Sequence, residues 1–266
     1  MGPMRAFVVA ACAILVVSCA GRPASVGGDK PGRAVARIPV PRPSPPAALP
    51  RPPWPWSAIG RVNRQGGGFC SGTLIGPDKV LMTAHCLWDA RLRRWTSAAD
   101  LHFLAGYHLG NYLAHGKAKA IELPAGIEMT AQGIPRRAAN DWAILTLTRP
   151  IGTESAVRPI EVARFKGRLR PNALGPLLRA GYGPLRPHAI ESARCRAVSL
   201  INPVVLLHDC CATSAESGFP ILLETPEGWR MLGLQMISPN QAVGCRGLGM
   251  ALLVTALERP RQMLLW

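Results

Sequence analysis

The 266-residue chain carries 31 Lys and Arg against 15 Asp and Glu, a net charge of +16, together with 27 Gly and 26 Pro. A hydrophobic content of 48% is enough to bury a core, which excludes a wholly disordered chain, and the Gly and Pro content excludes a coiled coil. The length suits one large all-β unit or two modest domains, and no basic run with interleaved aromatics indicates a nucleic-acid partner.

Residues 1–18 are predicted to be an export signal. Arg5 supplies the positive start, and residues 6–17 form an apolar stretch too short to span a membrane. The stretch runs into Val16-Val17-Ser18-Cys19, which resembles the lipobox of bacterial lipoproteins. The resemblance implies cleavage before Cys19 and lipidation of this cysteine. The residue after Cys19 is Ala20 and not Asp, which implies an outer-membrane lipoprotein that faces the periplasm. An ordinary secretory peptide is the alternative.

A Pro-rich segment, residues 19–57, follows the signal. Ten prolines lie between Pro31 and Pro55, which favours an extended, semi-rigid spacer behind the lipid anchor. A Pro-rich docking ligand is the alternative. The folded domain is expected over residues 58–266.

Six cysteines remain once two others are set aside, because Cys12 leaves with the signal peptide and Cys19 is expected to carry the lipid. An even number in an exported protein predicts three disulfides, although spacing cannot choose among the 15 possible pairings. No C-x-x-C pair is present and, except at His85-Cys86, no thiol sits beside a His in ligand spacing, so no metal is expected. The six are Cys70, Cys86, Cys195, Cys210, Cys211 and Cys245.

The first stretch that suggests chemistry is 66–86. Two stretches with apolar, strand-like runs, 66–75 and 80–86, are separated by the turn Gly76-Pro77-Asp78, and the second run ends at His85. A disulfide from Cys70 to Cys86 would close a loop of about 16 residues, which contributes roughly 3 kcal/mol in the chain-entropy model. It would also fix the backbone that carries His85.

Two further stretches carry an acid and a hydroxyl. Asp141 opens an apolar strand at 143–147, and Ser217 sits in a small-residue turn before another strand. Each has an ordinary reading alone, because Asp often caps a strand and Ser-Gly often forms a turn. The order His, Asp, Ser is more specific, since acyl transfer needs a nucleophile, a base and an anion that orients the base.

These stretches resemble the motifs of the trypsin/chymotrypsin-like serine peptidases, and of their bacterial branch, which includes the glutamyl endopeptidases. Thr83-Ala84-His85-Cys86 is similar to the family's T-A-A/G-H-C motif, one small residue short. Asn140–Leu145 is similar to N-D-I-A-L-L, and His208–Pro220 to the bacterial D-C-D-T-x-x-G-x-S-G-x-P segment. The likeness covers Ile59 to Val254.

The resemblance implies an all-β fold of two antiparallel six-stranded Greek-key β-barrels, at about 58–150 and 151–254, with the active site between them. A short C-terminal helix is expected within 257–266, starting at Pro260. The resemblance also implies a monomer that takes a protein or peptide substrate and needs no cofactor. Short apolar runs agree with the strands: 101–105, 118–123, 143–147, 231–237 and 250–254.

The resemblance assigns roles to three side chains. Ser217 would attack the scissile carbonyl, His85 would accept its proton and later protonate the leaving amine, and Asp141 would hold the imidazole. The backbone N–H groups of Ser217 and Ala215 would form the oxyanion hole.

Three residues around the nucleophile depart from the family pattern. Ala215 stands where Gly is usual, and Phe219 where a small residue is usual. Glu216 stands where animal relatives place an Asp that pairs with a newly cut N-terminus. These departures support an alternative function, a catalytically impaired pseudo-peptidase that acts as an envelope-binding lipoprotein.

The resemblance also implies the disulfides Cys195–Cys210 and Cys211–Cys245. It places the specificity pocket at Cys211, Ala212, Gln235 and Ser238. No acid lies at the pocket floor to select Arg or Lys, and Gln235 stands where glutamate-cleaving relatives have a His. A small or apolar substrate side chain is therefore expected.

The remaining basic features are given ordinary roles. Loop 88–97, with Arg91, Arg93 and Arg94, is expected to be a solvated basic loop, and contact with an anionic substrate or lipid surface is the alternative. The other histidines are expected to be surface or hydrogen-bonded side chains: His102, His108, His115, His188 and His208.

Overall fold

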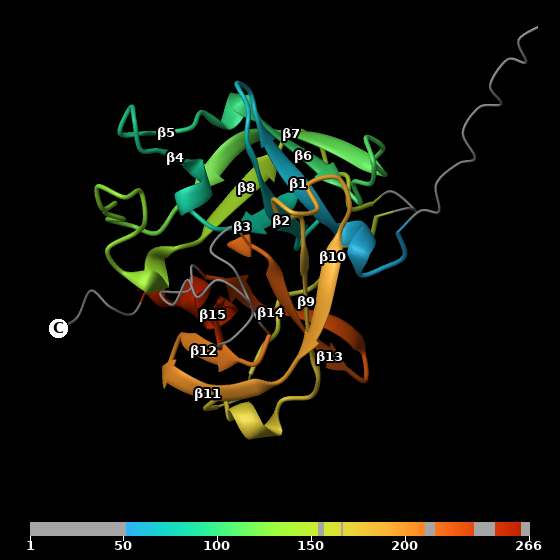
Figure 1. Cartoon of the computed structure of the whole chain (residues 1–266), viewed down its shortest axis with the longest axis vertical. Helices are drawn as coiled ribbons and strands as arrows, with labels where there is room; N and C mark the ends of the chain where they lie inside the picture. Colours follow the sequence, from blue (N-terminus) through green and yellow to red (C-terminus); the bar gives the residue numbers. More distant parts are fainter. Residues whose placement is uncertain (1–51, 154–156, 166, 211–215, 237–247, 262–266) are drawn as a thin grey trace, which may run out of the picture. The chain divides into compact units, whose positions relative to one another are not determined.

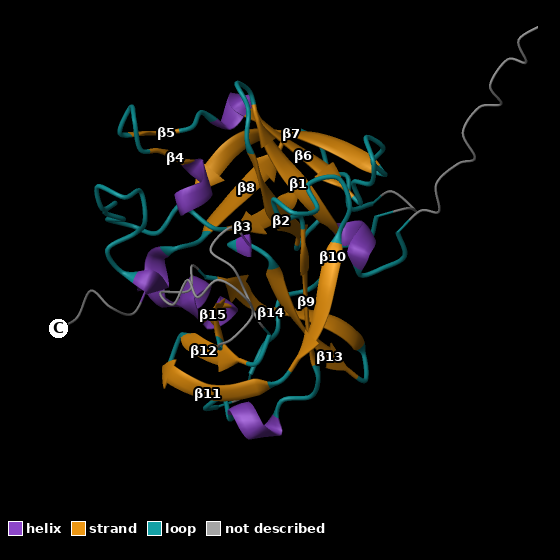
Figure 2. Cartoon of the chain, viewed as in Figure 1, coloured by secondary structure: helices purple, strands orange, loops and turns teal. Residues whose placement is uncertain are grey.

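Nearly all regular structure in the described part of the chain is β-strand, joined by short 3-10 helices (Figure 2). The structure is a computed structural model, and it describes residues 52–153, 157–165, 167–210, 216–236 and 248–261. All of these belong to one unit, residues 47–266. No helix within the described ranges is long and apolar enough to cross a membrane.

The first half is a closed, antiparallel six-stranded barrel with strand order β1-β2-β3-β8-β7-β6 (Figure 1). Its central strands alternate buried and partly exposed residues, the pattern of a strand with one face in a core. A two-stranded hairpin, β4 (Trp88–Asp89) with β5 (Arg94–Trp95), lies outside the barrel sheet. The barrel strands are β1 (Ile59–Arg64), β2 (Phe69–Leu74), β3 (Lys79–Met82), β6 (Leu101–Ala105), β7 (Ala114–Glu122) and β8 (Ala143–Leu147).

The second half is a seven-stranded antiparallel sheet with order β10-β9-β13-β14-β15-β12-β11. Its central strands β9, β13 and β14 are buried along most of their length. The strands are β9 (Leu177–Gly181), β10 (Glu191–Cys195), β11 (Ala197–Asn202), β12 (Val205–His208), β13 (Pro220–Thr225), β14 (Gly228–Gln235) and β15 (Gly249–Leu253).

The predicted all-β, two-barrel class is confirmed, but the second sheet differs from the expected closed barrel of six strands. Its two edge strands, β10 and β11, are consecutive in the chain and are separated only by Arg196. The N–H of Arg196 donates to the Asp209 carboxylate over 2.6 Å, and its carbonyl accepts from the Asp209 N–H over 3.1 Å, so Arg196 binds Asp209 instead of continuing the pairing of β10 with β9. The interruption divides one long strand into two, and each part pairs with a different neighbour.

Short 3-10 helices connect the strands. The last, η7 (Val254–Arg261), follows β15 directly, so the prediction of a helix starting at Pro260 was wrong in its starting point. The chain leaves the sheet at the buried Leu253 and turns at once. The others are η1 (Trp56–Ala58), η2 (His85–Leu87), η3 (Ala98–Asp100), η4 (Ala138–Asn140) and η5 (Pro171–Ala173).

Hydrogen bonds between buried groups join the two halves. The Ser71 hydroxyl on β2 accepts a hydrogen bond from the Tyr182 N–H over 2.8 Å. The Tyr182 hydroxyl donates to the carbonyl of Tyr107 over 2.7 Å, and burial raises the pKa of Tyr182 far above its usual value. The end of β9 is therefore fixed against the first barrel, beside the predicted site.

Candidate active site

His85 and Asp141 meet at the ends of two paired strands of the first barrel. Met82, the last residue of β3, pairs with Ala143, the first residue of β8. His85 begins η2 just after β3, and Asp141 follows the end of η4 just before β8. Antiparallel pairing therefore brings together two residues that are 56 positions apart in the chain.

The Asp141 carboxylate makes two hydrogen bonds to His85. One oxygen accepts from the backbone N–H over 3.0 Å, and the other lies 2.8 Å from ring Nδ1. A carboxylate only accepts hydrogen bonds, so Nδ1 carries the proton and Nε2 of the neutral ring keeps its lone pair. The side chains are 14% and 7% exposed, so this pair is largely shielded from water. The geometry suits a general base.

Ser217 occupies the second position of a tight turn. The Phe219 N–H donates to the Glu216 carbonyl over 3.2 Å, and Gly218 at the third position has φ +86°. A positive φ at this position is typical of a type II turn, which favours glycine there. Ser217 itself is 8% exposed.

Gly218 packs the Ser217 turn against the loop that carries His85. A Cβ on Gly218 would lie 3.1 Å from Thr83 Oγ1 and 3.3 Å from the Ser71 carbonyl oxygen. Thr83 is two residues before His85. The Gly218 N–H also donates to the Gln235 carbonyl over 2.9 Å. The structure thus brings all three predicted segments to one place between the two halves.

Two predicted disulfides are present in the structure. Cys70–Cys86 joins β2 to η2, with Cα atoms 6.3 Å apart, and Thr83 Oγ1 lies 3.2 Å from Cys86 Sγ. Cys195–Cys210 joins β10 to the end of the β12 segment. The disulfide Cys211–Cys245 lies outside the described residues, as do Cys211, Ala212, Ala215 and Ser238.

Gln235, the remaining residue of the predicted specificity pocket, is fully buried. Its amide NH₂ donates to the carbonyls of Met236 and Met250, at 3.0 and 3.1 Å, and its carbonyl oxygen has no partner among the described residues. The amide group is therefore fixed by the main chain around β14 and β15.

Glu216 forms a buried ion pair with Arg179, a residue the sequence reasoning missed. Arg179 Nη1 donates to Glu216 Oε2 over 2.6 Å, and the two side chains are 9% and 12% exposed. The feature of the sequence that could have indicated this ion pair is a single Arg within the otherwise apolar strand β9. Because Glu216 precedes Ser217, the pair attaches the turn of Ser217 and Gly218 to the second sheet.

Phe219 is accommodated by two glycines. A Cβ on Gly181 would lie 2.5 Å from the ring of Phe219, and one on Gly183 would lie 3.5 Å from its Cζ. The ring is 1% exposed, with the Arg179 guanidinium 5.4 Å from its centre. The large side chain of Phe219, which departs from the family pattern, therefore fits because the two glycines beside it have no side chain.

His208 differs from the expectation of a surface or hydrogen-bonded side chain. It is fully buried, and neither ring nitrogen has a well-aligned hydrogen bond among the described residues, although the Gln235 side chain and the Cys210 backbone lie near enough to act on its pKa. Burial, assisted by the positive charge of Arg179, lowers its pKa to about 4. Its ring lies near Cys195 and Cys210, but those two sulfurs are bonded to each other, which leaves only the imidazole as a ligand.

Three other histidines agree with the expectation. His102 Nδ1 and His115 Nε2 lie 2.9 Å apart, and His188 Nδ1 lies 2.8 Å from the Tyr107 hydroxyl.

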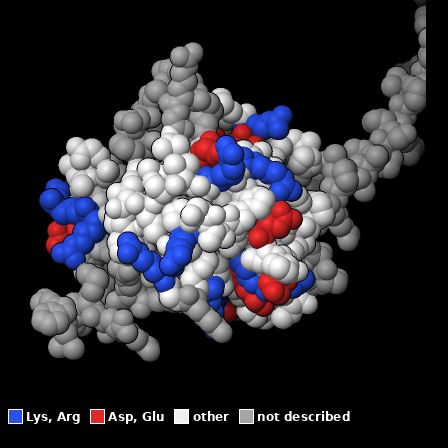
Figure 3. Space-filling view, turned by 90° about the horizontal axis from the view of Figure 1, so that it is seen from below, with Lys and Arg blue, Asp and Glu red and all other residues white. Residues whose placement is uncertain are grey.

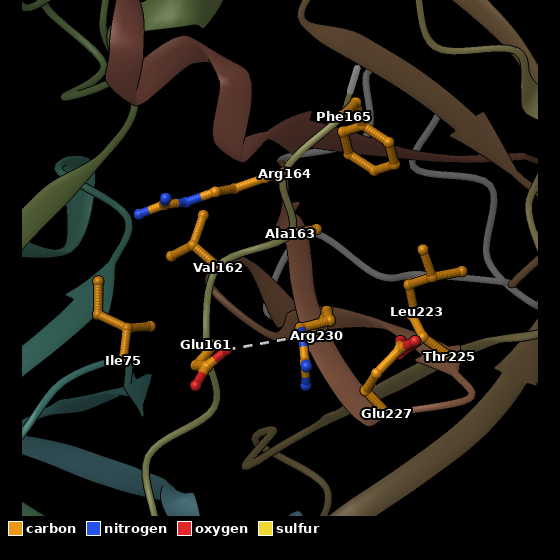
Figure 4. A pocket seen from close by; sticks show the side chains of 10 residues that line it. All are labelled: Ile75, Glu161, Val162, Ala163, Arg164, Phe165, Leu223, Thr225, Glu227 and Arg230. Carbon is orange, nitrogen blue, oxygen red and sulfur yellow. Dashed lines mark ion pairs between the residues drawn. The ribbon is translucent and has the colours of Figure 1, made fainter.

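A cavity of about 720 Å³ lies between segment 161–165 and the β13–β14 hairpin (Figure 4). Glu161 and Arg230 form an ion pair at its edge, 3.8 Å apart, and their side chains point toward each other in Figure 4. None of His85, Asp141 and Ser217 lines it, so it is separate from the candidate active site.

Comparisons with known proteins agree with this fold. The sequence model of the family described as Trypsin matches residues 48–202. The chain is 29% identical over 114 residues to the "Suppressor of tumorigenicity 14 protein homolog" of Bos taurus; this covers 40% of the chain but 12% of the relative. A solved structure titled "Structure of Glu endopeptidase in complex with MPD" shares the fold, with a TM-score of 0.61 and 15% identity over 77% of this chain and 89% of that one.

The all-β fold and the family match define a trypsin-like serine peptidase domain. The chain belongs to the trypsin family.

Proposed function

We propose that the chain is a serine endopeptidase that uses His85, Asp141 and Ser217 and is tethered to the bacterial cell envelope. The observation that carries the catalytic part is the joint placement of the three segments. Asp141 holds the His85 ring at 2.8 Å, and the Ser217-Gly218 turn packs on Thr83 in the same loop. The tether rests on the sequence of residues 1–57 alone.

The reaction follows from these roles. His85 Nε2 takes the Ser217 hydroxyl proton as the serine oxygen attacks the scissile carbonyl carbon. Asp141 stabilises the imidazolium that forms, and the imidazolium then protonates the leaving amine. Water, activated by the same His85, hydrolyses the acyl-enzyme and frees Ser217. Backbone N–H groups of Ser217 and Ala215 are the proposed donors to the oxyanion.

The ion pair of Arg179 with Glu216 supports activity without a newly cut N-terminus. A buried carboxylate needs a positive partner, and here the partner comes from within the folded domain. A lipidated N-terminus behind a long spacer is compatible with this arrangement. We therefore propose that the domain is active without proteolytic processing of its folded part.

Labelling with a fluorophosphonate tests the proposal. The full chain, folded and oxidised, is expected to react at Ser217, as located by peptide mass spectrometry, because a base-activated serine attacks such probes. Ser217→Ala should abolish labelling, whereas Ser214→Ala, a change in the same segment, should leave the modified residue unchanged. A well-folded sample that does not label at Ser217 would favour the pseudo-peptidase alternative.

A further inference from the structure

A basic pocket lies beside the candidate active site, between the β1–β2 turn and the β4–β5 hairpin. Its volume is about 680 Å³. One wall is the turn 64–67, and the other is the hairpin with the segment that follows it, 88–100. Figure 1 shows β4 and β5 standing apart from the barrel sheet. We call this feature the Arg64 pocket.

Both walls of the Arg64 pocket are fixed to the loop of His85. Strand β4 begins at Trp88, immediately after η2, which begins with His85. The Cys70–Cys86 disulfide connects η2 to β2, the strand that follows the β1–β2 turn. The wall of the pocket at Trp88 therefore begins directly after the short helix that carries His85.

The pocket has an excess of available positive charge. Arg64, Arg91 and Arg94 line it, and none of the three makes an ion pair in the described part of the chain. Of the two acids present, Asp89 uses one carboxylate oxygen to accept the N–H groups of Leu92 and Arg91, both at 3.0 Å. The bond from Leu92 is the largest cause of the lowered pKa of Asp89, and the nearby charges of Arg94 and Arg91 lower it further. The pocket thus keeps a net positive charge, because three arginines face two acids, Asp89 and Asp100.

The pocket walls are held in place. Trp88 and Trp95 pair across the hairpin and contact edge to face, with ring centres 5.0 Å apart. A Cβ on Gly68 would lie 2.7 Å from Arg64 Nη2, so the guanidinium lies across this glycine at the end of the turn. Gly66 and Gly67 have open space beside them, which lets a ligand approach the main chain closely.

We propose that the Arg64 pocket binds acidic side chains of the substrate, so that the enzyme selects acidic segments next to the bond it cuts. The inference rests on the proposed function and adds a substrate class to it. Carboxylates suit guanidinium groups, which can contact them through two parallel N–H groups. An anionic lipid surface is the other chemistry for a basic loop, but a walled pocket that admits single side chains favours a peptide.

Peptide binding to the full-length Ser217→Ala variant tests the proposal without depending on catalysis. The probe is a fluorescent peptide rich in Glu, and its control has Gln at the same positions. The Glu peptide is expected to bind more tightly, and Arg64→Gln/Arg91→Gln/Arg94→Gln should weaken it about tenfold. The matched control, Arg168→Gln/Arg170→Gln/Arg186→Gln, removes the same charge elsewhere and should leave binding within about twofold.

Each other outcome overturns the proposal. Equal binding of the two peptides excludes recognition of acidic side chains. Equal loss in both triple variants shows a general effect of net charge. Loss of phosphatidylserine vesicle binding, with peptide binding unchanged, assigns the pocket to a membrane. The same three Arg→Gln changes are also made in the natural chain, which keeps His85, Asp141 and Ser217, and fluorophosphonate labelling of Ser217 in that protein reports separately on the proposed function.

Discussion

The carboxylate of Asp141 illustrates how single residues set the chemistry of the site. One oxygen holds the backbone of His85 and the other holds its ring, so the same group fixes both the position and the tautomer of the base. The side chain is 7% exposed, which keeps competing water away from these hydrogen bonds. The Nε2 atom is thereby left as the proton acceptor.

The buried imidazole of His208 makes stability depend on pH. Its pKa is lowered to about 4, mainly by burial, while an unfolded His titrates near 6.5. Between these values the unfolded chain binds more protons, so the free energy of unfolding falls as pH drops from about 6.5 to about 4, by roughly 3 kcal/mol for this group. Urea unfolding at several pH values should show this slope, and His208→Gln should flatten it. An equal slope in both proteins contradicts this reasoning.

At the residue scale, the sequence predicted the pairing of His85 with Asp141 and the Cys70–Cys86 bond, and both are present in the structure. They could be predicted because each of these residues lies in a short motif of specific residue types. It did not predict the Arg179 partner of Glu216. That contact joins residues 37 positions apart through the pairing of β9 with β13, and no local pattern reports such pairing.

Strand β9 supports the nucleophile turn at the element scale. Arg179 pairs with Ile221 of β13, four residues after Ser217, and its side chain reaches back to Glu216. Gly181 of the same strand leaves space for Phe219. One strand therefore positions the residues on both sides of Ser217 and Gly218.

Removing the Arg179 charge should destabilise the domain and slow the labelling of Ser217. Arg179→Gln leaves the Glu216 carboxylate buried without its cation, which costs about 3–5 kcal/mol. Chemical denaturation and the rate of fluorophosphonate labelling measure the two effects. Arg194→Gln is the matched control, because its partner Glu224 is 46% exposed and surface pairs contribute about 0–1 kcal/mol. Similar losses in both variants would show that the pair does not support the turn.

At the element scale the sequence predicted strands at 101–105 and 143–147, and the structure has them at those positions. Their short apolar runs made them recognisable in the sequence. The division of β10 from β11 could not be predicted, because it depends on a hydrogen bond between Arg196 and Asp209, 13 residues apart.

Charge distribution is a property of the whole molecule. Despite the net charge of +16, the face in Figure 3 shows Lys and Arg in separate groups, several beside Asp or Glu. Two ion pairs of the described residues join exposed arginines to acids, Arg194 with Glu224 and Arg196 with Asp209. The Arg64 pocket differs from this pattern, because three arginines without an ion pair in the described part of the chain share one pocket. Such a group of arginines suits the recognition of acidic side chains.

Lipidation of Cys19 is the prediction that concerns the whole chain. Expressed with its signal in a bacterium with a two-membrane envelope, the protein should be recovered with the outer membrane and carry acyl groups on Cys19. Mass spectrometry of the mature N-terminus checks this. Cys19→Ala should be unacylated and lose its membrane association. Recovery of the natural sequence as a secreted, unacylated protein would leave the peptidase proposal standing without its tether.

Hydrolysis of fluorescent casein tests most directly whether the proposed base and nucleophile act as one unit. The assay compares the natural chain with the single variants His85→Ala and Ser217→Ala and with the double variant. Each single change should lower kcat by a factor on the order of 10⁴–10⁶, and the double variant should be no slower than either single variant, because one missing member already disables the other. Losses that multiply in the double variant, or full activity in Ser217→Ala, would contradict a shared mechanism for His85 and Ser217.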